Sequence, residues 1–288
     1  MVVGDLVTDV VVVPDGHVEV GTDTLAAITQ GGGGQGANTA AWLAHAGSAV
    51  TLVAAVGDDL SGRARIAELE AAGVRCAVRA HAGARTGTVV VLTSADERTL
   101  ITDPGAALLL DPVDVVAAIR GAPDAVHLHL SGYSLLNLGS RAGGLAALAA
   151  ARERGLTTSV DAASAAPLRR EGDFRTWVRE VDLLLCNSDE ADVLAGPGSP
   201  ADQAAALTAV ARNVVVKLGG DGAVWSGRDG TRRSVTGVRV PMMDPTGAGD
   251  AFAAGLLRAW CSGADPSAAM AAGAELGSSA VQRIGGRP

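Results

Sequence analysis

Residues 244–257 read DPTGAGDAFAAGLL, in which two carboxylates bracket a turn of small residues and an apolar run follows at once. This change of pattern predicts a helix over 246–260, with Thr246 as its cap. A helix N-terminus presents unpaired N–H groups and the positive end of the helix dipole, so it favours anions. A carboxylate placed there, Asp250, suits a base that takes a proton from a hydroxyl while that hydroxyl attacks a phosphate.

The composition around this stretch is that of an acidic protein with an aliphatic core. Of the 288 residues, 48% are apolar but only 2% are aromatic, so Val, Leu and Ala must fill the interior. The formal net charge is −8, and Lys217 is the only lysine. No basic surface is expected, and neither nucleic acid nor an anionic membrane is predicted as a partner.

The cysteines and histidines do not follow a disulfide or metal pattern. Cys76, Cys186 and Cys261 are odd in number and far apart, which predicts reduced thiols. His127 and His129 alternate along one expected strand without a third ligand at suitable spacing, so we expect histidines of the core.

The Val-rich start of the chain does not resemble a targeting or membrane segment. Asp5, Asp9 and Pro14 interrupt it, and no basic segment precedes it. We therefore expect a cytoplasmic protein.

Most of the sequence alternates continuous apolar strands with helices, which predicts a mostly parallel sheet covered on both faces. Strands are expected at 1–13, 50–56, 125–130, 157–160, 181–186 and 214–218, with antiparallel additions at 223–225 and 235–240. Helices are expected at 38–45, 61–72, 141–154, 189–195, 201–211, 246–260 and 266–283.

Two more polar strand regions do not fit that sheet and are expected to form a small second sheet. They cover residues 10–30 and 85–103, and the second contains a hairpin around residues 94–97. The predicted division is thus a core of residues 1–9, 31–84 and 104–288, with a β lid of residues 10–30 and 85–103.

Polar residues follow several of the expected strands. Ligands of open α/β sheets bind outside the carboxyl ends of the strands, so these residues are expected at one edge. They are Asp9, Ser131, Asp161, Asn187 with Glu190, Gly219 with Asp221 and Gly222, and Asp244 with Asp250.

The glycine-rich run at residues 31–36 has two interpretations. It does not directly follow a buried strand, which argues against a dinucleotide fingerprint, and the sequence contains no G-K-[ST] of a P-loop. The run is either a hinge or a backbone patch that a small polar ligand approaches, with Asn38 bonding hydroxyls of that ligand.

The segment from Asn187 to Glu190 also has two interpretations. It follows a buried strand and opens a helix, so Asn187 and Glu190 fit a capping box. Alternatively, the two side chains hold the water shell of a Mg²⁺ ion, which prefers oxygen ligands.

Taken together, the motifs resemble those of the ribokinase-like sugar kinases, the phosphofructokinase-B type family, over essentially the whole chain. The resemblance is carried, in order, by GDLVTD at 4–9, GGQGAN at 33–38, VGDD at 56–59, N-x-x-E at 187–190, LGGDG at 218–222 and DPTGAGD at 244–250. It implies a three-layer α/β sandwich with a central, mostly parallel sheet and a small β-sheet lid.

The resemblance also implies a role for each matching position. Asp250 would be the general base, and the N–H groups of Gly247, Ala248 and Gly249 would stabilise the transferring γ-phosphoryl group of ATP. The remaining implied positions are Asp9, Gly33, Gly34 and Asn38 for the substrate; Asn187, Lys217, Gly219, Asp221 and Gly222 for ATP; Asn187 and Glu190 for Mg²⁺ through water; and Asp244, Thr246 and Arg283 for K⁺.

The function implied is an ATP- and Mg²⁺-dependent kinase acting on a hydroxymethyl group of a sugar, with the lid joining two subunits. Ribose-specific members carry Asn, Lys and Glu in place of Val7, Gln35 and Ser131, so ribose itself is not implied. Ala107 likewise replaces an Asn usual in the family. The alternatives are a nucleoside kinase, a catalytically silent sugar-binding regulator, and an oxidoreductase, whose glycine-rich loop is missing.

Overall fold

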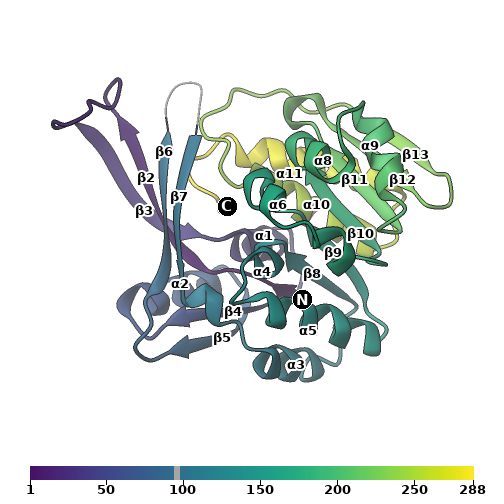
Figure 1. Cartoon of the computed structure of the whole chain (residues 1–288), viewed down its shortest axis with the longest axis horizontal. Helices are drawn as coiled ribbons and strands as arrows, with labels where there is room; N and C mark the ends of the chain where they lie inside the picture. The colour runs from purple at the N-terminus through teal and green to yellow at the C-terminus, as the bar shows by residue number, and fades with distance from the viewer. Residues whose placement is uncertain (94–97) are drawn as a thin grey trace.

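The computed structural model describes residues 1–93 and 98–288, which form a large α/β unit and a small sheet beside it (Figure 1). The large sheet of this described part has nine strands in the order β13-β12-β11-β10-β9-β8-β1-β4-β5. The seven strands from β11 to β5 are parallel, and β12 and β13 are antiparallel. The mostly parallel α/β sheet predicted from the sequence is therefore confirmed.

The strands of the large sheet are short, and those in its centre are apolar. The strands are β1 (Val2–Val3), β4 (Thr51–Gly57), β5 (Arg75–His81), β8 (His127–Ser131), β9 (Thr157–Asp161), β10 (Leu183–Asn187), β11 (Asn213–Lys217), β12 (Ala223–Gly227) and β13 (Arg232–Val235). Successive side chains of a strand point to opposite faces, so a continuous apolar strand needs helices on both sides.

Helices cover both faces of this sheet. One face carries α1 (Gln35–His45), α2 (Leu60–Ala71), α10 (Ala248–Cys261) and α11 (Pro266–Ala280); the other carries α3 (Pro112–Arg120), α5 (Arg141–Glu153), α8 (Ser188–Ala195) and α9 (Pro200–Leu207). The short helices are α4 (Tyr133–Leu136), α6 (Ala165–Arg170) and α7 (Phe174–Trp177). None of the helices in the described ranges is long and apolar enough to cross a membrane.

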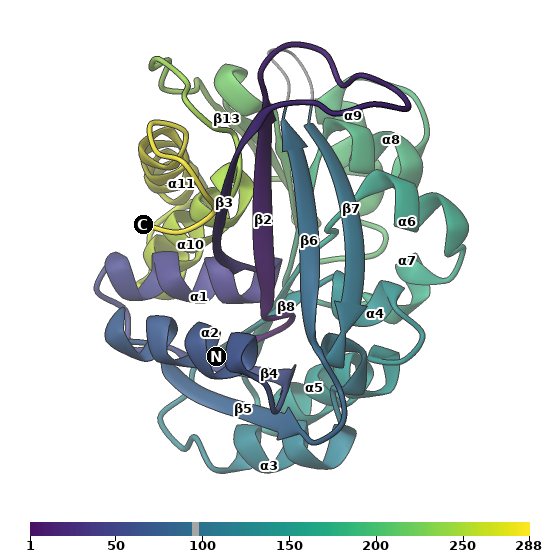
Figure 2. The ribbon, with the colours of Figure 1, turned by 90° about the vertical axis from the view of Figure 1, so that its left-hand side faces the viewer.

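The small sheet has the order β3-β2-β6-β7, and Figure 2 shows its four strands side by side in front of the large unit. They are β2 (Val7–Pro14), β3 (Ala26–Gly33), β6 (Thr86–Thr93) and β7 (Arg98–Gly105). The turn expected at 94–97 lies outside the described residues. The division of the chain into a core and a lid remains a prediction.

The first strand was predicted wrongly, because the chain changes sheets within it. We expected one strand over 1–13, but β1 ends at Val3 and β2 begins at Val7. Asp9 therefore belongs to the small sheet, where it pairs with Gly31 and Val89. Valines flank the segment between β1 and β2 on both sides, so the sequence does not indicate that the chain passes from the large sheet to the small one there.

Other differences are local. The strand expected at 235–240 is wrong, since β13 ends at Val235. The strand β5 and the helix α3 were not predicted, because the polar residues of β5 and the short length of α3 hide their periodicity. The histidines behave as expected of core residues: His127 bonds Thr157 and Ser159, and His129 bonds Ser159.

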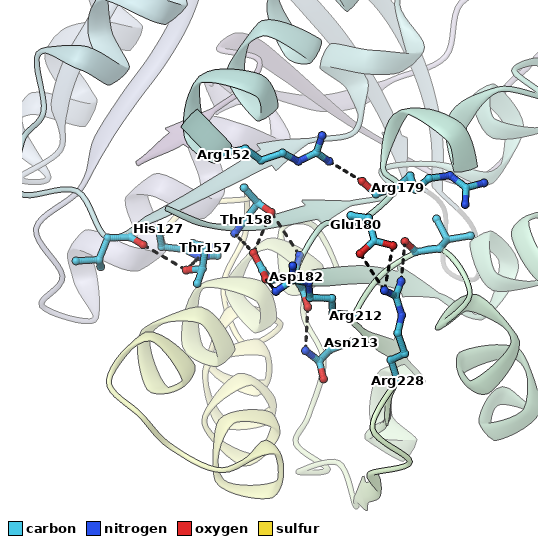
Figure 3. Close-up of polar contacts among 12 residues, drawn as sticks. His127, Arg152, Thr157, Thr158, Arg179, Glu180, Asp182, Arg212, Asn213 and Arg228 are labelled. Carbon is cyan, nitrogen blue, oxygen red and sulfur yellow. Dashed lines mark hydrogen bonds and ion pairs between the residues drawn. The ribbon is translucent and has the colours of Figure 1, made fainter. Parts of the chain in front are cut away.

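The amino ends of the central strands are joined by polar contacts, drawn in Figure 3. Asp182 accepts a hydrogen bond of 2.8 Å from the N–H of Thr158, and its own carbonyl accepts one of 2.9 Å from Asn213. Nearby, Arg228 and Glu180 form an ion pair at 2.9 Å. These contacts fix the register of the strands at the amino edge of the sheet. At the opposite edge, where the parallel strands end, the polar side chains face a cavity.

Asp59 joins the small sheet to the large unit. Its carboxylate caps α2 through the N–H of Gly62 (2.7 Å) and also accepts bonds from the N–H (2.8 Å) and the hydroxyl (2.6 Å) of Thr86, the first residue of β6. Gly57 allows this approach, because a Cβ there would lie 2.4 Å from the carbonyl oxygen of Ala84. The VGDD motif thus has a structural function at the base of the small sheet.

We expect Asp59→Ala to lower the free energy of unfolding by about 3 kcal/mol, since it removes a helix cap and two further charge-assisted hydrogen bonds. The adjacent Asp58→Ala is the matched control. Within the part of the chain that the structure describes, the side chain of Asp58 pairs with the exposed Arg63, so its loss should change stability by less than about 0.5 kcal/mol. Urea unfolding of both variants measures the difference, and equal effects would contradict the structural function of Asp59.

Candidate active site

Two cavities of about 530 Å³ each lie at the carboxyl edge of the large sheet and share Lys217, Pro245 and Gly249. The first lies between that edge and the small sheet; its lining includes Asp5, Val7, Asp9, Gly34, Asn38, Val89, Val91, Leu100, Asp161, Asn187, Glu190 and Asp250. The second lies beside α10 and α11; its lining includes Gly219, Gly220, Asp221, Gly222, Val238, Met242, Ala248 and Phe252. Residues at the start of α10 therefore line both cavities.

Asp250 lies in the first turn of α10 and lines the first cavity. Its Oδ2 accepts a hydrogen bond of 2.9 Å from Nδ2 of Asn38, which projects from α1. Burial raises the pKa of Asp250 to about 8; the bond from Asn38 opposes the rise and the carboxylate of Asp161 adds to it. A carboxylate that titrates near neutral pH can accept a proton and release it again.

The turn before α10 differs in one respect from the expectation. Thr246 does not cap the helix, because its hydroxyl and its N–H both donate to Oδ1 of Asp244, at 2.6 and 2.8 Å. The residue before the helix is instead Gly247, with a left-handed φ of 74°. A Cβ on Gly247 would lie 2.4 Å from the carbonyl oxygen of Gly286, so only glycine fits.

Lys217 ends β11 and stands at the junction of the two cavities. Its Nζ lies 2.6 Å from Oδ2 of Asp161, and both side chains are largely buried. Burial alone would lower the pKa of Lys217, but the carboxylates of Asp161 and Glu190 outweigh it and raise that pKa. The ammonium group therefore stays charged at every physiological pH.

A chain of hydrogen bonds continues from this ion pair across the floor of the first cavity. Asp161 Oδ1 accepts a bond from Gln35 (3.1 Å), Gln35 Oε1 accepts one from Ser131 (2.7 Å), and the Ser131 hydroxyl lies 2.9 Å from Asp5. Asp5 also accepts bonds from the N–H groups of Gln35 and Gly36 and so holds the start of α1.

Asn187 and Glu190 form the capping box that was one of the two interpretations of this segment. Asn187 Oδ1 accepts from the N–H of Glu190 (2.9 Å), and Glu190 Oε2 accepts from the N–H of Asn187 (2.8 Å). Burial raises the pKa of Glu190 to about 7, and the Asp161 carboxylate adds to the rise. Within the described residues no group of three or more His, Cys, Asp or Glu side chains could hold a metal ion by itself.

The glycine-rich run packs around side chains and does not form a loop before the helix. Gly31 to Gly33 belong to β3, and α1 begins two residues later. A Cβ on Gly33 would lie 1.9 Å from Oδ1 of Asp9, and one on Gly34 would lie 2.5 Å from the carbonyl oxygen of Asp5. Asp9, Gly34 and Asn38 all line the first cavity.

The remaining predicted positions fall in three places. Gly219, Asp221 and Gly222 line the second cavity, where Asp221 also pairs with Arg239 at 2.8 Å. Asp244 is buried behind the turn of α10, and its Oδ2 accepts a bond from the N–H of Gly285. Arg283 lies over the ring of Trp42, at 5.8 Å from its centroid.

Three side chains of the first cavity received no role from the sequence. Asp5 and Asp161 were noted only as parts of motifs or strand ends, and their link through Gln35 spans residues too distant for any local pattern to reveal. Tyr133 was missed, although its place two residues after β8 is a strand-end signal of the kind already used.

Comparison with known proteins identifies the class of this site as that of a kinase that phosphorylates an alcohol group. A model described as pfkB family carbohydrate kinase matches residues 1–288, so the chain belongs to that family. The ATP-dependent ribose-1-phosphate kinase of Halopiger xanaduensis is 32% identical over 268 residues, which cover 90% of this chain and 83% of that protein.

Solved structures show the same fold. Adenosine kinase from Sinorhizobium meliloti has a TM-score of 0.89 at 24% identity and covers 100% of this chain and 94% of its own. An E. coli protein solved in complex with ATP and Mg²⁺ has a TM-score of 0.85 at 21% identity, covering 99% and 93%. The ribokinase-like fold expected from the motifs is confirmed.

The raised pKa of Asp250 predicts a pH-dependent gain in stability for Asp250→Asn. The folded-state pKa of about 8 exceeds the ordinary value of 3.8, so the folded protein loses stability as pH rises between these values and the carboxylate ionises. An uncharged amide avoids that loss. The melting temperature of the variant should therefore exceed that of the wild type by an amount that grows from pH 5 to pH 8 and is constant above.

Thermal melts of both proteins at pH 5, 7 and 9 measure this gap. A gap that is the same at all three pH values would show that Asp250 ionises in its ordinary range.

Proposed function

We propose that this chain transfers the γ-phosphoryl group of ATP to a hydroxyl, of the hydroxymethyl type, on a small uncharged carbohydrate, with Asp250 as the general base. The observation that supports this most directly is the position of the Asp250 carboxylate. It lies at the positive end of α10, where a cavity suited to the acceptor meets a second cavity suited to the nucleotide.

In this proposal the acceptor hydroxyl lies against Asp250 and loses its proton to the carboxylate as its oxygen attacks the γ-phosphorus. The bond between that phosphorus and the β,γ-bridging oxygen breaks, and ADP leaves. The N–H groups of Gly247, Ala248 and Gly249, together with Lys217, face the negative charge on the transferring group. Asp9, Gly33, Gly34 and Asn38 would contact the hydroxyls of the acceptor.

Gly219, Asp221 and Gly222 would hold the nucleotide, whose phosphates would then lie toward Lys217 and Asn187. The described residues offer no cluster of three acidic or imidazole ligands, which fits a Mg²⁺ ion that keeps several waters and is held mainly by phosphates. Asn187 and Glu190 would bind its water shell. When bound, Mg²⁺ neutralises charge on the phosphate oxygens.

A K⁺ site at Asp244 and Thr246 is part of the proposal. Asp244 is buried, and the described part of the chain gives it hydrogen bonds but no ion pair. A buried carboxylate without a cationic side chain beside it favours a bound cation. Arg283, also placed at this site from the sequence, stacks near Trp42 instead.

The charges of the first cavity favour an uncharged acceptor. Its described lining carries six carboxyl groups, of which Asp250 and Glu190 titrate near neutral pH, against one ammonium group, Lys217, which is already paired with Asp161. The six carboxyl groups are those of Asp5, Asp9, Asp161, Asp189, Glu190 and Asp250. A sugar phosphate or sugar acid would meet net repulsion here, whereas neutral hydroxyls can donate to these oxygens.

A nucleoside acceptor is the second candidate. The small sheet covers the first cavity with aliphatic side chains, Val7, Val89, Val91 and Leu100, against which an apolar base could pack. The polar side chains at the edge of the large sheet would then contact the ribose, and the aliphatic side chains of the small sheet would contact the nucleobase. A silent regulator is disfavoured, because Asp250 is both present and placed at the junction of the cavities.

Two assembly features complete the proposal. The small sheet exposes apolar side chains such as Ile28 and Ile101, which favours a homodimer through this sheet. The acidic surface and the small-molecule site are consistent with a cytoplasmic enzyme without nucleic-acid or membrane partners.

The role of Asp250 is tested with a panel of sugars and nucleosides assayed for ADP release with MgATP. On the accepted substrate, Asp250→Asn should reduce kcat by about 10³-fold or more, because the amide cannot take the proton. Asp58→Asn is the surface control. Equal turnover by Asp250→Asn and the wild type would refute the role of Asp250, and no turnover of any substrate by the wild type would favour a regulator.

The charge of the acceptor is tested by pairing each neutral substrate with its phosphorylated counterpart. We expect kcat/KM for the neutral compound to exceed that for the anionic compound by about 100-fold or more, since the anion must approach several carboxylates. The same comparison at high salt should narrow the ratio. A preference for the phosphorylated compound would contradict the proposal for the acceptor while leaving Asp250 as the base.

A further inference from the structure

We propose that Arg287 is a positioning residue: it fixes the orientation of the Asn38 amide and thereby keeps the hydrogen bond from Asn38 on Asp250. The inference rests on the proposed function in one respect only, that Asp250 acts as the base. The contacts themselves do not depend on the identity of the acceptor.

Arg287 follows α11 and reaches back to the start of α1. Its Nε donates to Oδ1 of Asn38 at 3.2 Å, and its Nη2 donates to the carbonyl oxygen of Gly33 at 2.9 Å. Its Nη1 lies 3.5 Å from Oε2 of Glu68, and 14% of its side chain is exposed. Arg287 is thus a largely buried cation whose planar head is held on three sides.

The chemistry of the guanidinium group decides which way the amide of Asn38 points. A guanidinium has only donors, whereas an amide carries an acceptor on one side and two donors on the other. With Arg287 beside it, Asn38 can only turn its oxygen toward Arg287, so its NH₂ group must face Asp250. The contact from Asn38 to Asp250 is then always a donor to the carboxylate, which stabilises the ionised base.

The backbone leaves room for this arrangement. A Cβ on Gly32 would lie 2.0 Å from Nη1 of Arg287, and a Cβ on Gly286 would lie 2.6 Å from Nδ2 of Asn38. Neither glycine has a left-handed φ, so these two positions need glycine because a side chain would collide with Arg287 or Asn38. Part of the glycine-rich run is therefore explained by the volume of the Arg287 head.

Without Arg287, the amide of Asn38 could turn over and present its oxygen to Asp250. An amide oxygen accepts a hydrogen bond only from the protonated carboxyl group, so this orientation favours the neutral acid. The other charged or titratable groups that influence Asp250 are Asp5, Asp161, Lys217 and Tyr133, and none of them contacts Arg287. Those that influence Arg287 are Glu68, Arg65, Asp9 and Cys76.

The test follows the titration of the Asp250 carboxyl by ¹³C NMR, assigned with Asp250→Asn, in the absence of any acceptor. We expect Arg287→Met to move the apparent pKa upward by about one unit, as loss of a charge-assisted hydrogen bond would. The rising limb of kcat/KM against pH should shift in the same direction. In Arg287→Lys the new side chain is also a pure donor, so the apparent pKa of Asp250 should stay close to its wild-type value.

Two controls separate orientation from charge and from folding. Glu68→Gln removes the ion-pair partner of Arg287 but leaves the contact with Asn38, so the Asp250 titration should be unchanged. In an Asn38→Ala background, Arg287→Met should produce no further shift. If Arg287→Met does not fold, Arg287→Leu, which also carries no donor, replaces it with the same expected shift.

An unshifted titration in Arg287→Met would overturn the proposal. A shift of the same size in the Asn38→Ala background would also overturn it, because Arg287 would then act by its charge across space. Because the titration needs no turnover, its outcome is independent of whether the proposed phosphoryl transfer is correct.

Discussion

The hydrogen bond between Asn38 and Asp250 is the contact on which the site depends, because it joins two helices 212 residues apart at their starting turns. For this bond to form, α1 and α10 must begin at the same edge of the large sheet. Asp5 fixes the start of α1 by accepting the N–H groups of Gln35 and Gly36 from outside the helix. Asp5 therefore replaces the side-chain cap that Gly34 cannot supply.

Glycines determine how closely the surrounding segments can approach this bond. Cβ atoms on Gly4 and on Gly36 would each lie 2.8 Å or less from the Cα of the other residue, so the segment just after β1 meets the first turn of α1 backbone to backbone. Gly247 packs in the same way on Gly286, which in turn packs on Asn38. A methyl group on Gly286 would therefore meet the Asn38 amide directly, and one on Gly247 would push against Gly286 behind it.

Much of the fold could be predicted from the sequence, because apolar strands and amphipathic helices are local patterns. The place of Asp250 at a helix start and the strand-end positions of Asn187, Lys217 and Asp161 follow from the same reasoning. The split of the first strand could not be predicted, since residues 1–13 are equally apolar on either side of the crossing. The role of Asp5 and the contact from Arg287 to Asn38 depend on tertiary distances that no local pattern encodes.

The distribution of charge gives the two cavities different chemistry. In the described lining of the first cavity, six carboxyl groups outnumber the one ammonium group, so an approaching polyphosphate would be repelled there. Among the described residues that line the second cavity, Asp221 is the one carboxylate, and it is paired with Arg239. The cation Lys217 and the positive end of α10 lie between them. On the proposed function, the nucleotide must therefore enter from the side of the second cavity, and its terminal phosphate meets the acidic cavity only where Lys217 and the helix N-terminus offset the repulsion.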